Sequence, residues 1–154
     1  MLKHGTIVYT ESLDIGSSLK NRNRSLKICT GGKMMDKNTS KKMAAIAYRA
    51  LEDKKAENIR VIDIEQVSVI ADYFLIASGS NRNQVQALAE NVEEQLYKAG
   101  YEKKQTEGYT QGNWILLDYG DIVIHIFDHE NRLFYDLERI WKDGNDIDAK
   151  ELEL

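Results

Sequence analysis

The chain has 154 residues, of which 42% are hydrophobic and 30% charged, so its length suits one domain with its own core. Its single cysteine, Cys29, has no disulfide partner, which agrees with the reducing cytoplasm where we expect the protein. No apolar run is long enough to span a membrane, and the first residues lack the apolar centre of a signal peptide, so we expect neither a membrane nor a secreted protein.

Charge is distributed unevenly along the chain. Residues 1–33 hold six basic and two acidic side chains, a formal charge of +4, whereas the rest of the chain holds 15 basic and 23 acidic ones, a formal charge of −8. Contacts from Lys and Arg to phosphate supply most of the non-specific affinity of a protein for nucleic acid. The acidic body therefore argues against a direct DNA binder, and we expect its partner to be a protein surface.

Residues 1–33 show no sustained helical or alternating pattern, so we expect a disordered N-terminal extension. The residues before Met34 can be encoded as ACA-GGA-GGT-AAA, which contains a ribosome-binding sequence. One hypothesis is therefore that translation begins at Met34 or Met35, and the alternatives are a genuine flexible tail and a transit peptide. The intact mass of protein expressed from its own upstream DNA distinguishes these starts, because a full-length product would contradict the internal one.

The regular pattern begins with a helix predicted over residues 41–55, with Ser40 as its N-cap. Residues 59–64 are mostly β-branched and apolar, which predicts a strand. Residues 72–77 form a continuous apolar run, which is typical of a strand covered on both faces. A Gly-Ser turn then leads into the longest helix, predicted over residues 82–99.

The second half of the chain is predicted to be rich in strands. A short strand is expected within residues 101–107, and residues 114–118 and 122–127 predict two strands joined by a tight hairpin. The order of the elements predicts an α/β domain over residues 34–145, with a mixed β-sheet flanked by helices.

A last helix is predicted over residues 131–142. Its spacing places Leu133, Leu137, Ile140 and Trp141 on one apolar face. Residues 146–154 are expected to fray as a C-terminal tail.

Two histidines with acidic neighbours, His125 and His129, raise the hypothesis of a metal site. The first lies in a predicted strand and the second just beyond it, so they lack the shared helical face of a ligand pair. His125 shares a strand face with Val123 and Phe127, which is typical of a hydrogen-bonded structural histidine. We expect no metal and no cofactor.

A second chemical hypothesis rests on Gly79-Ser80 before the long helix and on Asp118 and Asp121 further along. Nucleotidyltransferases hold triphosphate at such a helix start and Mg²⁺ on carboxylates of the sheet. Here the two aspartates bracket a hairpin turn, where aspartate is also an ordinary turn residue. We expect a nucleotidyltransferase-like fold without the catalytic constellation, with Mg²⁺-dependent nucleotidyl transfer or nucleotide binding as the alternative function.

Trp114 begins a strand directly after a polar loop, Gln111-Gly112-Asn113, which we expect to be flexible. It either caps the core or is partly exposed beside Ile115 and Leu116. An aromatic and aliphatic patch rimmed by charge is the composition of a protein-binding hot spot. Both interpretations remain open at this stage.

Four ordered blocks between about residues 40 and 142 carry a family resemblance. They read ALEDKKAENI (50–59), DYFLIASGS (72–80), GNWILLDYGDIVIH (112–125) and YDLERIW (135–141). These blocks resemble the Iojap family, the ribosomal silencing factors, whereas residues 1–33 match nothing in it.

The resemblance implies a mixed-sheet α/β fold related to nucleotidyltransferases, no established catalytic activity, and a homodimer. It also implies binding to large-subunit ribosomal protein number fourteen, which excludes the small subunit and reduces translation when nutrients are scarce. The partner-binding residues that it carries over are Trp114, Ile115, Leu116, Asp118, Tyr73 and Asp72. The acidic groups Asp118 and Asp121 are expected to face the basic surface of the ribosomal protein.

Overall fold

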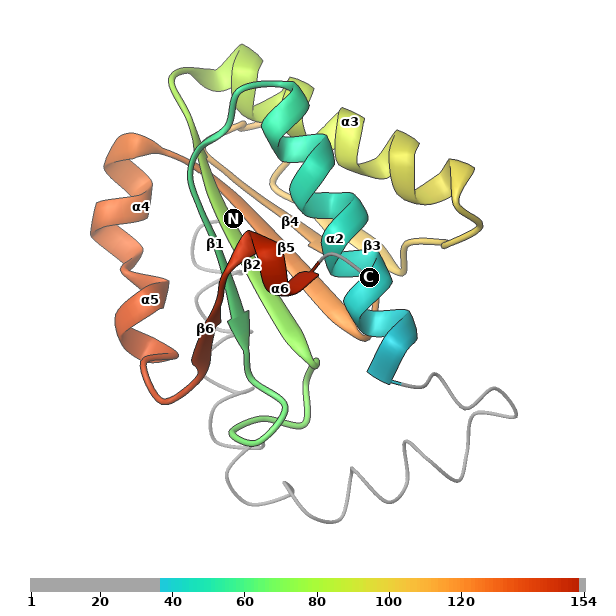
Figure 1. Cartoon of the computed structure of the whole chain (residues 1–154). Coiled ribbons are helices and arrows are strands. Elements are labelled where there is room, and N and C mark those ends of the chain that lie inside the picture. Colours follow the sequence, from blue (N-terminus) through green and yellow to red (C-terminus); the bar gives the residue numbers. More distant parts are fainter. Residues whose placement is uncertain (1–36, 153–154) are drawn as a thin grey trace.

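The computed structural model describes residues 37–152, and the expected N-terminal extension and internal start lie outside this range. Six strands form one sheet in the order β3-β4-β5-β2-β1-β6, with helices on both faces (Figure 1). The elements are α2 (Lys37–Asp53), β1 (Glu57–Asp63), β2 (Tyr73–Gly79), α3 (Arg82–Lys98), β3 (Gln105–Glu107), β4 (Trp114–Asp118), β5 (Ile122–Asp128), α4 (His129–Tyr135), α5 (Leu137–Ile140), β6 (Asn145–Ile147) and α6 (Ala149–Leu152). None of the helices in the described range has both the length and the apolar content needed to cross a membrane.

The predicted mixed sheet is confirmed. Its central pair, β2 and β5, is parallel from Tyr73 opposite Ile122 to Gly79 opposite Asp128, and the other pairs are antiparallel. All seven residues of β2 are buried, as the continuous apolar run predicted for a strand covered on both faces.

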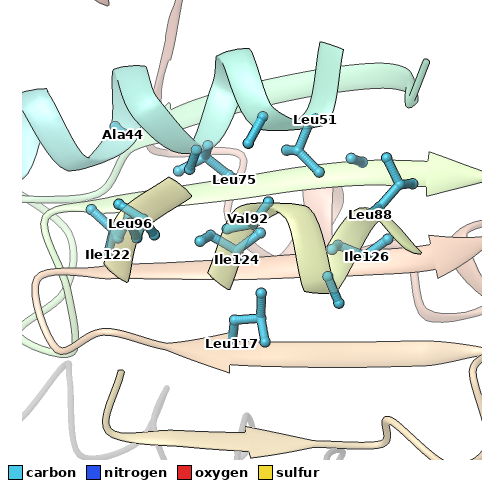
Figure 2. Packing of buried hydrophobic residues seen from close by; sticks show 14 of the residues in the cluster. Ala44, Leu51, Leu75, Leu88, Val92, Leu96, Leu117, Ile122, Ile124 and Ile126 are labelled. Atoms are coloured by element: carbon cyan, nitrogen blue, oxygen red, sulfur yellow. The ribbon is translucent and has the colours of Figure 1, made fainter. Parts of the chain in front are cut away.

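The larger core lies between the sheet and the helices α2 and α3. Figure 2 shows the side chains of both helices meeting those of the central strands. Within this core, Asn91 of α3 donates a side-chain hydrogen bond to the carbonyl oxygen of Ala50 in α2 at 2.7 Å, which fixes the two helices relative to each other. The principal contributors are Leu51, Leu75, Leu88, Val92, Leu96, Leu117, Ile122, Ile124 and Ile126.

The opposite face of the sheet is covered by α4 and α5, which are much shorter. The single predicted helix over residues 131–142 is wrong, because Asp136 adopts a left-handed conformation (φ 45°) and divides it. The expected apolar face is divided too. Leu137 and Trp141 are buried against the sheet, whereas Leu133 is 82% exposed and Ile140 38% exposed.

The start of the first helix also differs from the prediction. The helix begins at Lys37, so Ser40 lies inside it and is not its N-cap. The buried Ser40 hydroxyl instead donates to the Asp72 carboxylate at 2.7 Å. A serine before an apolar pattern is a capping signal only when the helix begins there. Here the hydroxyl is used in a tertiary contact instead.

The expected frayed tail is not observed in the described residues. Strand β6 pairs antiparallel with β1, Val61 lying opposite Ile147, and α6 follows it. Leu152 is only 2% exposed and joins the core beneath α2. The C-terminal segment is therefore part of the folded domain.

Replacing Leu152 tests this packing. Leu152→Ala is expected to lower the free energy of unfolding by about 2–4 kcal/mol, because it removes buried methyl groups and leaves a cavity. Urea denaturation monitored by circular dichroism measures the loss. Glu151→Ala is the matched control at an exposed neighbour, and equal midpoints for the two variants would show that the tail does not pack.

Candidate protein-binding surface

An aromatic cluster occupies the face of the sheet beneath α4. The ring of Trp114 lies 5.0 Å from that of Phe127 and 4.4 Å from that of Tyr135, measured between centroids. The Tyr135 ring in turn meets the ring of Phe134 edge-on at 5.0 Å. Trp114, the first residue of β4, is thus connected to the outer surface of α4 through two successive ring contacts.

Trp114 also makes a polar contact within the cluster. Its indole Nε1–H donates to Nδ1 of His125 at 3.3 Å. His125 is fully buried, and burial lowers its pKa to about 3, so the imidazole is neutral and can accept this bond. The interpretation of His125 as a hydrogen-bonded structural histidine is confirmed.

His129 lies in a different environment from His125. It is about half exposed, and its Nε2 lies 2.8 Å from the Glu57 carboxylate. Among residues 37–152, no three His, Cys, Asp or Glu side chains converge as a metal-ligand set would.

The loop before Trp114 is bonded to α3. Gln86 donates to the carbonyl oxygen of Tyr109 at 2.8 Å, and Arg82 donates to that of Thr110. Gly108 has a φ of +77°, and a Cβ there would lie 2.0 Å from the carbonyl oxygen of Trp114. Only glycine fits so close to the strand, so this loop fixes where β4 begins. Within the segment that we expected to be flexible, the N–H of Gly112 donates to the carbonyl oxygen of Gly108 and the carbonyl oxygen of Asn113 accepts from the N–H of Asp128, each at 3.0 Å.

The partner-binding residues carried over from the family do not share one surface. Trp114 and Leu116 face α4 and α5, each 6% exposed, whereas Ile115 and Tyr73 belong to the core under α2 and α3. Alternation along β4 sends neighbouring side chains to opposite faces. The partly exposed interpretation of Trp114 is not supported in this chain, and Trp114 belongs to the core.

The acidic residues of the predicted set are mostly internal. Asp72 is 7% exposed and accepts the bond from Ser40, and Asp121 is 4% exposed. Asp118 is half-buried, and its carboxylate accepts a hydrogen bond from the backbone N–H of Gly120 at 2.8 Å in the hairpin turn. Only Asp118 is therefore accessible enough to serve as a rim charge, and the expectation for Asp121 is wrong.

The most exposed apolar side chains near the cluster were missed by sequence reasoning. Leu133 is 82% exposed and Phe134 78% exposed, and both lie on α4. Helical periodicity placed Leu133 on the core face, because the predicted helix ran without a break through Asp136. Asp128, which caps α4 by accepting from the N–H of Asn131 at 2.8 Å, was the available signal for an earlier and shorter helix.

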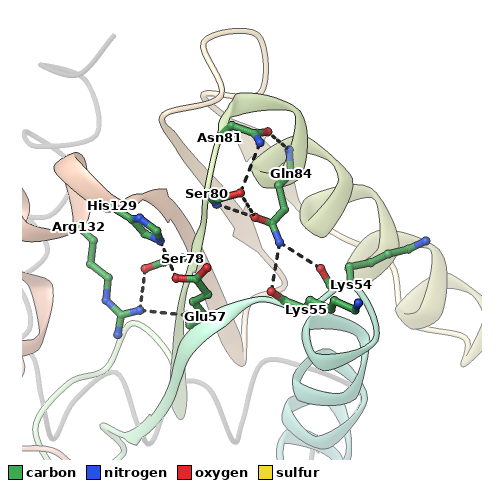
Figure 3. Close-up of polar contacts among 9 residues, drawn as sticks. All are labelled: Lys54, Lys55, Glu57, Ser78, Ser80, Asn81, Gln84, His129 and Arg132. Carbon is green, nitrogen blue, oxygen red and sulfur yellow. Dashed lines mark hydrogen bonds and ion pairs between the residues drawn. The ribbon is translucent and has the colours of Figure 1, made fainter.

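Arg132 holds α4 against the sheet. Figure 3 shows its guanidinium donating to the Ser78 hydroxyl at 2.8 Å and, more weakly, to the carbonyl oxygen of Glu57 at 3.4 Å. It also forms an ion pair with Glu138 of α5 at 2.8 Å. One side chain therefore connects both short helices to the strands β1 and β2.

The nucleotidyltransferase constellation is not assembled. Gly79 lies opposite Asp128 at one end of the parallel pair, while Asp121 directly precedes Ile122 at the other end. Six residues of extended strand separate the two ends by roughly 20 Å. The Gly-Ser turn and the aspartates therefore cannot act on one triphosphate.

The start of α3 is also occupied by its own side chains, as Figure 3 shows. Asn81 accepts from the N–H of Gln84 at 2.9 Å, and the Gln84 side chain accepts from the N–H of Ser80 at 2.6 Å. The Gln84 amide then donates to the carbonyl oxygens of Lys54 and Lys55. These bonds use for capping some of the amides that a phosphate would need.

The buried His125 predicts a pH dependence of stability. The unfolded chain takes up a proton near the ordinary pKa of 6.5, whereas the folded chain does so only near pH 3. The stability contributed by neutral His125 is therefore present above pH 6.5 and is lost as the pH falls toward 3, by about 2–3 kcal/mol over the first two pH units. Urea denaturation at about pH 6.5 and pH 4.5 should show a smaller decrease for His125→Asn than for the parent chain, and equal decreases would contradict the assignment.

Comparisons with known proteins agree with this architecture. Residues 37–154 match the family model described as ribosomal silencing factor during starvation. The ribosomal silencing factor RsfS of Bacillus subtilis is 42% identical over 104 residues, which cover 68% of this chain and 88% of that protein, and the chloroplastic Iojap protein of Arabidopsis thaliana is 32% identical over 69% of this chain and 42% of that protein. A crystal structure from Chromobacterium violaceum has 34% identity and a TM-score of 0.64, and the match covers 65% of this chain and 83% of that one. A crystal structure from Bacillus halodurans has 36% identity and a TM-score of 0.62, and the match covers 69% of this chain and 96% of that one. The chain belongs to the family of ribosomal silencing factors.

Proposed function

We propose that this chain binds the large ribosomal subunit through ribosomal protein number fourteen and blocks its association with the small subunit. It would thereby repress translation under nutrient limitation in the cytoplasm. Family membership supports the silencing role, because its relatives are named ribosomal silencing factors. The observation that carries the choice of contact surface is the exposed Leu133-Phe134 pair on α4.

An exposed leucine next to an exposed phenylalanine favours the binding of a protein partner at this surface. Of the five exposed large hydrophobic side chains in the described range, three lie on α4 and α5: Leu133, Phe134 and Ile140. Burying a leucine or phenylalanine side chain against a partner contributes about 1.5–3 kcal/mol each. A few such anchors supply most of the energy of a typical interface.

Strand β4, which begins at Trp114, would then support this surface from beneath. Trp114 supports Tyr135, and Tyr135 supports Phe134, through the ring contacts described above. We propose that Trp114 positions the contact residues without touching the partner. This role differs from the direct contact that the family resemblance implied.

Charge favours a basic protein partner over RNA. The chain after residue 33 carries a formal charge of −8. Such a surface is repelled by phosphate and is attracted to the Lys and Arg side chains of a ribosomal protein. Charge of this kind sets the encounter rate and orientation more than the final affinity.

The proposed mechanism needs occupancy and no chemical step. A folded body of this size has a radius of gyration of roughly 13 Å and is therefore about 35 Å across. A body of that width on one face of the large subunit prevents close approach of the small subunit. The affinity need only be high enough to compete with subunit joining.

Removing the exposed pair tests the surface. Leu133→Ser with Phe134→Ser is expected to weaken binding to isolated large subunits by about 30-fold or more, since hot-spot residues contribute 2 kcal/mol or more. The free energy of unfolding should change little, because surface substitutions usually cost within about 0.5 kcal/mol. Sucrose-gradient co-sedimentation measures binding, and addition of small subunits then measures the recovery of subunit joining.

Glu151→Ser is the control, because it alters an exposed residue on α6, away from the pair. A folded double variant that still sediments with large subunits would exclude α4 as the contact. We also propose a homodimer, as the family resemblance implies. Light scattering distinguishes a role of the pair in the homodimer from a role in ribosome binding. A double variant that becomes monomeric yet binds large ribosomal subunits would assign the pair to the dimer interface.

A further inference from the structure

A cleft of about 590 Å³ lies beside the C-terminal half of α3, away from α4 and α5. Its walls combine tyrosines with carboxylates: Glu90, Glu93, Glu94, Tyr97, Tyr101, Glu102, Lys103 and Tyr119. The volume is that of a site for a small ligand or a single long side chain.

The cleft carries an excess of negative charge. Four glutamates line it against one lysine, Lys103, which pairs with Glu93 at 2.7 Å. Glu94 pairs with Lys98 at 2.9 Å on the rim. In the described part of the chain Glu102 forms no ion pair, so its carboxylate is available to a cation.

Tyr119 is the second and independent indication of a ligand. Its side chain lines the cleft although the residue is only 4% exposed. Within residues 37–152 its phenol makes no hydrogen bond, and its oxygen is not among the fully enclosed atoms, so the hydroxyl is open to a ligand in the cleft. Burial, with a smaller contribution from Glu93, raises its pKa to about 12, so the group remains a neutral hydroxyl.

Two more tyrosines supply aromatic surface. Tyr97 is 75% exposed, and Tyr101 is partly buried against the core. A cation over a tyrosine ring is attracted by the negative face of the ring. The guanidinium group of arginine suits such a site best, because it is flat, stacks on rings and presents five N–H donors to carboxylates and hydroxyls.

We propose that this cleft binds an arginine side chain presented by a basic polypeptide. Glu102 and Glu94 accept from the guanidinium, the rings of Tyr97 and Tyr101 stack against it, and the Tyr119 hydroxyl accepts a further N–H. The site is separate from the Leu133-Phe134 surface and stands without it.

Titration with an acetylated, amidated Gly-Arg-Gly-Arg-Gly peptide tests the site. In ¹⁵N-labelled full-length chain at low salt, amide shifts are expected at residues 97–103 and 119, and the lysine counterpart of the peptide should bind more weakly. Tyr119→Phe and Glu102→Gln should each weaken binding about three- to tenfold, since the first removes a hydrogen-bond acceptor and the second removes the charge that strengthens the bond to the guanidinium. Tyr119→Phe retains the buried ring, and Glu102→Gln alters an exposed side chain, so both variants should fold.

Glu151→Gln is the matched control for loss of one surface charge, and its affinity should equal that of the parent chain. Shifts confined to other surfaces, or unchanged affinity in both cleft variants, would overturn the proposal. Peptide binding to the cleft in a chain that fails to bind large subunits would leave this site standing while the proposed ribosomal function falls.

Discussion

The parallel pairing of β2 with β5 places two strands that are buried on both faces at the centre of the sheet. The helices of the fold cover those two faces. On one side, α2 and α3 supply 17 residues each and bring aliphatic side chains. On the other side, α4 and α5 supply only seven and four residues, so large rings such as Phe74, Trp114 and Trp141 fill the space that longer helices would occupy.

This unequal cover explains how the α4 surface arises. In a continuous helix, Leu133 and Leu137 would lie on one face, since residues four apart are neighbours. The left-handed Asp136 breaks that relation, so Leu137 faces the sheet while Leu133 faces solvent. The short helices bury little area themselves, and Arg132 compensates by bonding both of them to the strands. An exposed apolar pair is thus held on a well-anchored support, which would reduce the ordering cost of the partner binding that we propose.

The polar groups that suggested nucleotide chemistry have structural roles in this chain. At one end of the β2–β5 pair, Asn81 and Gln84 cap α3, and at the other end Asp118 closes the hairpin turn. A strand–turn–helix unit with nearby aspartates can therefore serve the fold alone, with its polar atoms bonded to each other. The two surfaces that we propose for partners differ in chemistry, since the exposed Leu133 and Phe134 on α4 are apolar and the α3 cleft is acidic and tyrosine-lined.

The order and type of most elements, the mixed sheet, the buried central strand and the structural His125 followed from the sequence, because periodicity and continuous apolar runs are local properties. The same patterns could not show which face Trp114 occupies, since both faces of β4 are apolar and only the helices above them define the surface. Nor could they anticipate that Ser40 would bond Asp72 or that residues 145–147 would pair with β1. These contacts join residues far apart in the chain, so their energy exists only in the folded state. Tertiary packing alone therefore decided that Trp114 is core and that Leu133 and Phe134 are surface.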